Sequence, residues 1–274
     1  MLLISACLIH SSVAQFIFTG PGFLPDKNGT NPDEPETGKV APRLAPGAVV
    51  KDCTDCPEMV VIPSGSFVMG SNKSSDEQPT HSVNLVGFLM GKTEVTQEEW
   101  VAVMGNNPST NKGRTLSVEW VSWDDVQQFI AKLNQKTGQK FRLPSEAEWE
   151  YSARAGTATE WSFGNDESKL GNYAWHNRNS SYTTQAVGQK LPNAFGLFDM
   201  HGNMWEWTQD CWHETYAGAP TDGSAWTIGC SGNYRVLRGG SSYDFPAILR
   251  SAFRGRNIPL NRDNYFGFRL ARDL

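Results

Sequence analysis

Apolar side chains recur at helical spacing between residues 96 and 156. Three segments in this region start with a hydroxyl residue followed three positions later by an acidic residue, which is the capping-box pattern of a helix start. Each pattern lets side-chain oxygens satisfy backbone amides of the first helical turn. We therefore predict three helices, the second closed by Gly138 and the third by Gly156. The capping pairs are Thr96 and Glu99, Ser122 and Asp125, and Ser145 and Glu148.

Strand patterns flank this helical region. Residues 58–69 alternate apolar and polar side chains around Pro63 and Gly65, which predicts a β-hairpin, and residues 81–90 predict a further strand. Near the C-terminus we expect closing strands within residues 236–242, 249–254 and 266–271.

Regular periodicity fades after residue 156, where Gly, Asn, Ser and Trp dominate. Long irregular stretches in a compact domain need support from bound ions, disulfides or a dense aromatic core. Asn and Asp side chains and the carbonyls of Gly-rich turns are natural ligands for a hard cation such as calcium. Helices, strands and long loops in this mixture predict an α+β fold.

The N-terminus shows features of an exported protein, for which we expect the bacterial periplasm or cell surface. Residues 1–14 have the apolar core and the small residues of a secretory signal, and they are too short to span a membrane as a helix. An alternative is a lipoprotein signal, in which Cys7 carries the lipid and anchors the chain at a bacterial cell surface or outer membrane. Residues 15–48 are rich in Pro and Gly and predict a flexible tether, so we expect the folded domain to cover residues 49–274.

Composition excludes several classes of protein. The chain has 274 residues, of which 39% are hydrophobic and 19% charged, with a formal net charge of −5. These values are typical of a globular protein rather than a disordered chain or a multi-span membrane protein. The acidic balance argues against a nucleic-acid partner, because no basic stripe is present to neutralise phosphates.

Four cysteines remain once Cys7 is set aside, and an even number in an exported chain favours disulfides. We favour Cys211–Cys230 and the local bridge Cys53–Cys56 among the possible pairings. The alternatives are a redox pair or half a zinc site at Cys53 and Cys56, and a metal site at Cys211, His213 and Cys230.

Several segments, taken in order, resemble the formylglycine-generating enzyme family, also called the sulfatase-modifying-factor family. The match runs from about Glu58 to the C-terminus. The segments are IPSGSFVMGS at 62–71, KTEVTQEEW at 92–100, VEWVSWDDVQQF at 118–129, FRLPSEAEWEYSARAG at 141–156, PNAFGLFDMHGNMWEW at 192–207, VLRGGS at 236–241 and NYFGFRLA at 264–271.

The resemblance implies a fold and two structural calcium sites. The fold is a variant of the C-type lectin-like fold, in which a small twisted antiparallel sheet carries helices and ion-braced loops. The first calcium set is Asn172, Tyr173, Asn179 and Ser181, with carbonyls from Tyr173 and Ser181. The second set is Asp199, Gly202, Met204 and Glu206, with carbonyls from Gly202 and Met204.

The family oxidises a substrate cysteine to formylglycine with dioxygen and a copper(I) ion, which two cysteines hold after a Gly-Gly-Ser turn. Soft thiolates suit copper(I), whereas carboxylates and hydroxyls do not. Here Asp244 falls at the first cysteine position, the following loop is shorter, and no cysteine occurs after Cys230. We therefore expect no copper in this chain.

Three hypotheses for function follow. The first is a diverged oxidoreductase or maturation factor, similar to the maturation factors of the pyoverdine siderophore, that acts on a peptide or secondary metabolite. The second is a non-catalytic lectin-like module that binds a peptide, protein or glycan, and the third is formylglycine generation, which the missing cysteines disfavour. For the first, the candidate catalytic residues are Asp244 as a base or metal ligand, with Tyr243, Ser241, Trp205 and Arg254; three of these, Trp205, Ser241 and Arg254, fall at positions that line the family's substrate cleft.

Overall fold

The computed structural model describes residues 44–274, and all structural statements concern this range. The predicted signal, the lipidation of Cys7 and the tether up to residue 43 lie outside the described residues. The Gly47 N–H donates to the Val61 carbonyl at 2.8 Å, and the Ala48 carbonyl accepts from the Val61 N–H at 2.9 Å. The chain is therefore already bonded to the sheet before residue 49.

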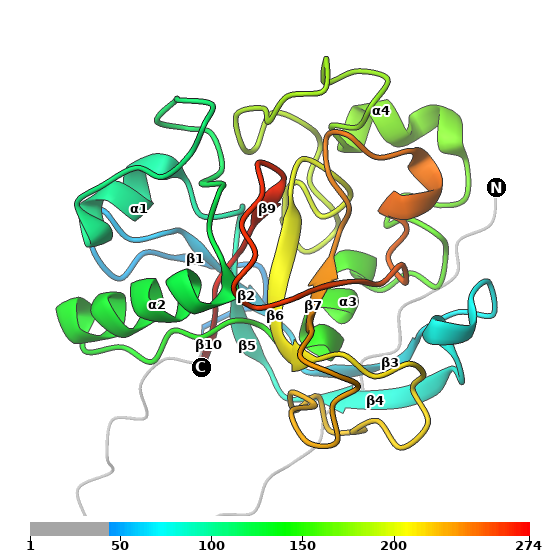
Figure 1. Cartoon of the computed structure of the whole chain (residues 1–274). Helices are drawn as coiled ribbons and strands as arrows, with labels where there is room; N and C mark the ends of the chain where they lie inside the picture. The colour runs from blue at the N-terminus through cyan, green and yellow to red at the C-terminus, as the bar shows by residue number, and fades with distance from the viewer. Residues whose placement is uncertain (1–43) are drawn as a thin grey trace, which may run out of the picture. The chain divides into compact units, whose positions relative to one another are not determined.

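Two sheets of four strands each and one two-stranded sheet form within residues 44–274 (Figure 1). The first sheet has the order β1-β2-β5-β10, and all its neighbours are antiparallel. Its strands are β1 (Val49–Val50), β2 (Met59–Ile62), β5 (Phe88–Gly91) and β10 (Ala271–Asp273).

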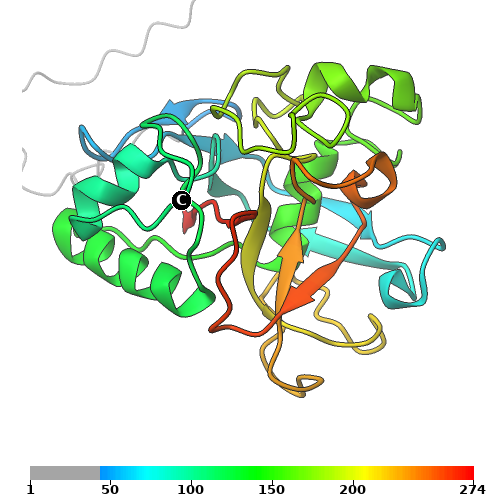
Figure 2. The same cartoon turned by 45° about the horizontal axis from the view of Figure 1, so that its top comes forward.

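The second four-stranded sheet has the order β8-β7-β6-β9 and runs through the middle of the domain. Figure 2 shows β7 and β8 (orange to red-orange) beside β6 (yellow). β6 is antiparallel to β7 and parallel to β9. The strands are β6 (Trp205–Cys211), β7 (Arg235–Arg238), β8 (Gly255–Asn257) and β9 (Phe266–Gly267).

The hairpin predicted over residues 58–69 is wrong. Both halves are strands, but β2 pairs with β1 and β5, whereas β3 (Gly65–Met69) pairs only with β4 (His81–Leu85). Every residue of β2 is buried, whereas β3 alternates between half-buried and exposed positions up to its buried last residue, Met69. The strand predicted over 81–90 likewise divides into β4 and β5, which belong to different sheets.

The three predicted helices are present, and both hydrogen bonds of each capping box form. They are α1 (Gln97–Met104), α2 (Trp123–Thr137) and α3 (Glu146–Arg154). Gly138 ends α2 in the left-handed conformation as expected, but Ala155 rather than Gly156 takes that role after α3, with φ of 45°.

The helices cover opposite faces of the central sheet. α1 and α2 lie on one side of β6, and α3 lies on the other (Figure 1). Adjacent residues of β6 point to opposite faces: Trp207 packs with Phe129 and Phe268 on the α2 side, and Glu206 accepts a hydrogen bond from the Trp149 indole of α3 at 2.7 Å. β6 thus contributes side chains to the core on the α2 side and to the core on the α3 side.

The C-terminal strands differ from the prediction. The segment 249–254 is not a strand, because the short 3₁₀ helix η3 (Pro246–Leu249) and a turn precede β8. β7 ends at Arg238 because Gly239 and Gly240 adopt positive φ, and residues 266–271 divide between β9 and β10.

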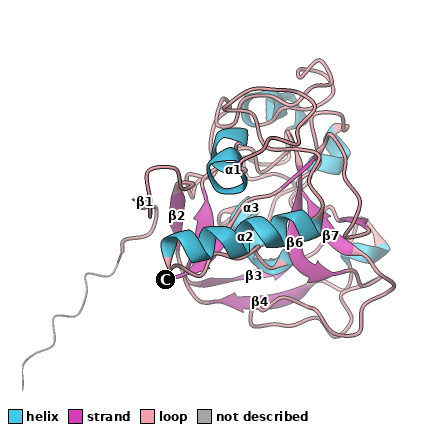
Figure 3. Cartoon of the chain, turned by 60° about the vertical axis from the view of Figure 1, so that its left-hand side comes forward, coloured by secondary structure: helices cyan, strands magenta, loops and turns pink. Residues whose placement is uncertain are grey.

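Long loops connect the remaining elements, as the loss of periodicity predicted (Figure 3). They contain three short helices, η1 (Ser75–Glu77), η2 (Glu167–Lys169) and α4 (Leu170–Tyr173). None of the helices in residues 44–274 combines the length and apolar character needed to cross a bilayer.

Candidate functional site

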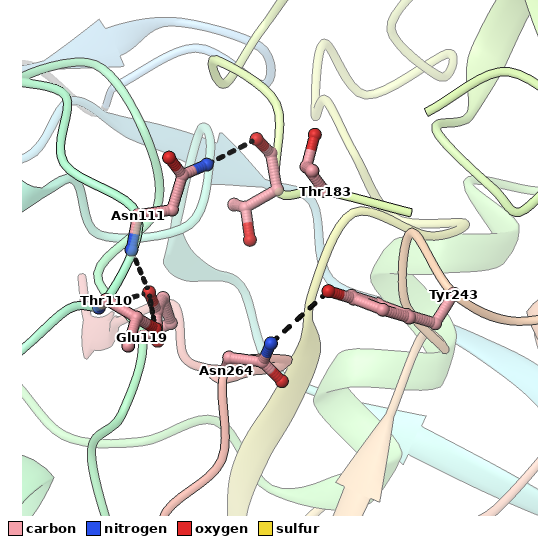
Figure 4. Close-up of a pocket in the computed structure, with 7 residues that line it drawn as sticks. Thr110, Asn111, Glu119, Thr183, Tyr243 and Asn264 are labelled. Carbon is pink, nitrogen blue, oxygen red and sulfur yellow. Dashed lines mark hydrogen bonds between the residues drawn. The ribbon is translucent and has the colours of Figure 1, made fainter. Parts of the chain in front are cut away.

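A cavity of about 330 Å³ opens between four loops that are distant in sequence (Figure 4). The loops come from the α1–α2 connection, the segment after α4, the turn after β7 and the segment before β9. We call this cavity the Tyr243 pocket. Its lining residues are Thr110, Asn111, Glu119, Thr183, Thr184, Tyr243 and Asn264.

Glu119 fixes one wall of the Tyr243 pocket. Its buried carboxylate accepts hydrogen bonds from the Thr110 N–H at 2.6 Å, the Asn111 N–H at 2.8 Å and the Thr110 hydroxyl at 2.7 Å. The Asn111 amide then donates to the Thr184 carbonyl at 3.4 Å and links this wall to the next (Figure 4). Carboxylate bonds to backbone amides are strong, so the wall is set before any ligand arrives.

Tyr243 and Asn264 form the opposite wall, where the Asn264 amide donates to the Tyr243 hydroxyl at 3.2 Å (Figure 4). The Tyr243 ring lies 6.1 Å from the Tyr182 ring and 5.8 Å from the Tyr265 ring, centroid to centroid. Burial, followed by a hydrogen bond with Asp263, raises the pKa of Tyr265 to about 12. Tyr265 is therefore a neutral phenol at physiological pH.

Three residues that adjoin the lining in sequence, which we call the rim of the Tyr243 pocket, have a strained backbone. Trp120, Ser181 and Tyr182 have φ values of 63°, 56° and 54°, a region that bulky residues seldom adopt. Each is a near neighbour in sequence of a lining residue, and Trp120 and Tyr182 are 43% and 54% exposed. Strained residues cluster at functional sites. Neither Trp120 nor Tyr182 was predicted as a site residue, because a positive φ leaves no pattern of hydrophobicity in the sequence.

The candidate catalytic residues are dispersed, and among them Tyr243 lines the pocket. Asp244 accepts hydrogen bonds from the Ser241 N–H at 2.9 Å and from the Ser241 hydroxyl at 2.6 Å. These bonds stabilise the turn from Ser241 to Asp244. Trp205 is half-buried with its ring 6.0 Å from that of Phe253.

Arg254 lies away from the pocket in a buried ion network. Its guanidinium donates to both oxygens of Glu146, at 2.7 and 3.0 Å, and to the carbonyls of Asp76 and His213. Burial alone would raise the pKa of Glu146, but Arg254 and Arg238 outweigh it and hold that pKa below its usual value. A structural role explains these contacts, and the predicted catalytic roles of the five residues stay predictions.

The disulfide prediction is confirmed: Cys53–Cys56 and Cys211–Cys230 both form. The alternative metal site at Cys211, His213 and Cys230 therefore lacks thiolates, and the His213 ring stacks on Trp226 at 3.5 Å. Within residues 44–274, no cysteine keeps a thiol to offer copper(I).

The second calcium set fits a hard cation in part. Asp199 is 2% exposed and has one oxygen that no donor among the described residues reaches, while the other accepts from the Gly188 N–H at 2.7 Å. Burial raises the pKa of Asp199 to about 6. Glu206, in contrast, accepts from Arg269 at 2.6 Å on both oxygens, and the Gly202 carbonyl accepts from the Met204 N–H at 2.8 Å.

Glu94 is an acidic neighbour that the resemblance does not include. It is fully buried, and one of its oxygens also has no donor among the described residues. Burial, then the negative charges of Asp199 and Glu206, raise its pKa well above the usual value. Two buried carboxylates with unpaired oxygens suit a divalent cation, although no three Asp, Glu, His or Cys side chains of residues 44–274 converge as a cage.

The first calcium set contains no carboxylate, and its Asn179 side chain already has partners on both of its polar atoms. The Asn179 side chain accepts from the His176 N–H at 2.8 Å and donates to the Ala174 carbonyl at 2.9 Å. The Asn172 carbonyl accepts from the Leu191 N–H, Tyr173 stacks on Phe163, and Ser181 forms the strained rim. Calcium at either set stays a prediction.

Comparison with known proteins identifies the family. The family model described as "Sulfatase-modifying factor enzyme 1-like domain" matches residues 45–274. The chain belongs to this family. The resemblance given by the sequence motifs is thereby confirmed, and the family domain extends over the whole body that the structure describes.

Solved structures of similar proteins confirm the fold as α+β and related to C-type lectins. PvdO from Pseudomonas aeruginosa is 38% identical with a TM-score of 0.78, and the match covers 84% of this chain and all of PvdO. Variable protein 1 of Treponema denticola is 32% identical with a TM-score of 0.76, covering 83% of this chain and 99% of that protein. The mouse formylglycine-generating enzyme is 27% identical over 79% of this chain and 75% of the mouse enzyme.

Proposed function

We propose that this sulfatase-modifying-factor domain binds a peptide or small metabolite in the Tyr243 pocket. The observation that carries the proposal is the pocket itself: a cavity of about 330 Å³ with a wall fixed by Glu119 and an aromatic rim held in a strained backbone. A preset wall lowers the ordering cost of binding, and Tyr and Trp side chains supply contact area at low entropy cost.

The residues that line the pocket favour recognition over the family's copper chemistry. Besides the buried Glu119, all lining groups are hydroxyls, amides or the Tyr243 phenol. Asp244, at the position of the family's first copper cysteine, is bonded to Ser241. Incubation with a Cys-x-Pro-x-Arg peptide, with and without copper, should therefore yield no aldehyde by mass spectrometry.

Binding is tested by screening the protein against a panel of short peptides and phenolic metabolites, followed by calorimetric titration of each hit. Tyr243→Ala should weaken binding about tenfold or more, because it removes an aromatic wall and the partner of Asn264. Tyr234→Ala is the matched control, since Tyr234 is 38% exposed against 36% for Tyr243 and lies outside the pocket. Equal losses in both variants, or no hit, would refute the proposal.

A second candidate is oxidative maturation of the bound ligand by chemistry that does not use paired thiolates. The identity with the mouse formylglycine-generating enzyme and the fold shared with PvdO favour it. Oxygen uptake measured with each hit, with and without added iron or copper, separates the two candidates. Uptake that depends on Tyr243 supports the enzyme; binding without uptake supports the module.

We propose that the domain works in an oxidising compartment outside the cytoplasm. Two disulfides support this location, because reducing systems keep cytosolic thiols free. Labelling of free thiols in protein taken directly from the source cells tests it, and four reactive thiols in the folded domain would contradict it.

A further inference from the structure

A second cavity, of about 340 Å³, lies between the end of β3, the end of α3 and the turn after η3. It shares no lining residue with the Tyr243 pocket. Its lining differs from that of the Tyr243 pocket, because it contains three cationic side chains and one carboxylate, that of Glu160. The lining residues on which the argument rests are Asn72, Lys73, Thr80, Arg154, Asn165 and Arg250.

Arg154 and Arg250 are held rigidly at this cavity. Arg154 is 5% exposed and donates to Glu150 at 2.7 and 2.9 Å, to the Gly70 carbonyl at 3.1 Å and to the Thr159 carbonyl at 3.2 Å. Arg250 is 7% exposed and donates to the two oxygens of Glu77, at 2.6 and 3.0 Å, and to the Ala247 carbonyl. Both guanidinium planes are therefore fixed.

The backbone of Gly70 also helps to hold Arg154 and Glu150 in place. Its N–H donates to Glu150 at 2.9 Å, and its carbonyl accepts from Arg154. Gly70 has φ of 88°, and a Cβ there would lie 2.3 Å from the Glu77 carbonyl oxygen. Only glycine fits this close approach between the two arginine–glutamate pairs.

The hydrogen-bonding capacity left at this cavity consists mostly of donors. A guanidinium carries five N–H groups. Four hydrogen bonds from Arg154 and three from Arg250 reach acceptors among the described residues, so N–H groups remain on both. Within residues 44–274, the amide nitrogens of Asn72 and Asn165 and the hydroxyl of Thr80 also reach no acceptor. Asn72, Thr80 and Asn165 are exposed and can bond water, whereas Arg154 and Arg250 are buried. Buried N–H groups require an acceptor, so a ligand with several oxygens would satisfy the unused N–H groups of the two arginines.

We propose that this cavity binds an oxyanion, such as the carboxylate of an acidic sugar or a sulfate or phosphate group. Lys73 supplies a mobile positive charge: its side chain is 54% exposed and pairs with Glu160, which is 31% exposed. Such exposed ion pairs are weak, so Lys73 can exchange Glu160 for a ligand oxygen. The two buried arginines provide fixed donors beneath it, as charge-assisted bonds to oxyanions require.

Calorimetric titration of the purified protein at constant ionic strength tests the proposal, with sodium sulfate, sodium phosphate, sodium glucuronate and neutral glucose as probes. We expect saturable binding of at least one anion and none of glucose. Tighter binding of glucuronate identifies a carboxylate sugar, and tighter binding of sulfate or phosphate identifies a sulfated or phosphorylated ligand.

Lys73→Gln should weaken anion binding about tenfold, because it removes one charge-assisted donor. The domain should stay folded, because the Lys73 side chain is exposed and no buried carboxylate depends on it. Lys136→Gln is the matched control, since Lys136 is 42% exposed, pairs with Asp55 and lies on α2 outside the cavity. Glucose binding as tightly as the anions, equal losses in both variants, or no binding of any anion would each overturn the proposal. Tyr243→Ala should leave anion binding intact, which separates this proposal from the function proposed above.

Discussion

Asp244 and Ser241 are hydrogen-bonded to each other in the turn that follows β7. The Asp244 carboxylate accepts from the Ser241 N–H at 2.9 Å and the Ser241 hydroxyl at 2.6 Å, and the Asp244 N–H donates back to the Ser241 carbonyl at 3.1 Å. The Asp244 side chain thus stabilises its own turn.

The turn predicts a structural effect for Asp244→Ala. Hydrogen bonds to a charged group contribute about 1.5–3 kcal/mol, so the free energy of unfolding in urea should fall by roughly that amount. Ser241→Ala should show a smaller loss, because it removes the hydroxyl but keeps the N–H donor. The double variant should lose less than the sum, because both changes remove the same hydroxyl–carboxylate bond. An Asp244→Ala protein of normal stability that binds a screening hit but no longer oxidises it would instead make Asp244 catalytic.

Arg254 gives a second prediction, through its buried pair with Glu146. The side chains of Arg254 and Glu146 are 0% and 5% exposed, so Arg254→Met leaves a buried carboxylate without its main partner. Breaking such a pair costs about 3–5 kcal/mol of the free energy of unfolding, measured in urea.

Arg256→Met is the matched control for that experiment. Arg256 lies two residues further along and pairs with Glu214, but these side chains are 40% and 63% exposed. We expect little or no change in stability. An Arg254→Met variant as stable as Arg256→Met would show that the stability of the buried ion network does not depend on Arg254.

Asp210 predicts how stability changes with pH. Burial, then the negative charge of Glu146, raise the pKa of Asp210 to about 7 from 3.8. Between these values the folded state holds a proton that the unfolded state has released. This group therefore lowers the free energy of unfolding as the pH rises from about 4 to 7. Above about pH 7 Asp210 is ionised in both states, and its contribution no longer changes with pH.

Asp210→Asn should flatten this decline, measured as the free energy of unfolding at several pH values. The variant also loses one acceptor, since Asp210 accepts from the N–H groups of Glu146 and Trp226, so the slope rather than the absolute stability is the readout. Asp222→Asn serves as control, because Ser224 lowers the pKa of exposed Asp222 and its contribution has the opposite sign. An unchanged slope in Asp210→Asn would rule out this role.

Local signals in the sequence predicted the helices. The pairing of the strands depends on non-local contacts, and the sequence did not predict it. Ser122 and Asp125 are only three residues apart, so their capping box is visible in the sequence, although Arg262 also donates to Asp125 in the fold. The partners of β2, in contrast, come from β1 and β5, and β-pairing across a long separation leaves no mark in either strand alone.

The same distinction applies to the candidate site. The motifs identified the loop that carries Tyr243, but Glu119, Thr183 and Asn264 reach the pocket only through tertiary folding. The position of Arg254 suggested a cleft, whereas its buried partner Glu146 lies 108 residues away and places it in an ion network. Strain at Trp120 and Tyr182 depends on backbone conformation and is not encoded by residue type.

Calcium is the last prediction, and it rests on the unpaired oxygens of Asp199 and Glu94. A cation that binds only the folded state at a hundredfold excess over its Kd adds about 2.7 kcal/mol, which for a domain of this size raises the Tm by roughly 5–10 °C. Melting curves in calcium and in EGTA should differ by about this amount. Asp199→Asn and Glu94→Gln should each abolish the difference, because each removes a buried charge and an unpaired carboxylate oxygen. Asn172→Ala should abolish it only if the first set holds the ion; identical curves for the unaltered protein in calcium and EGTA would exclude a structural calcium at both sets.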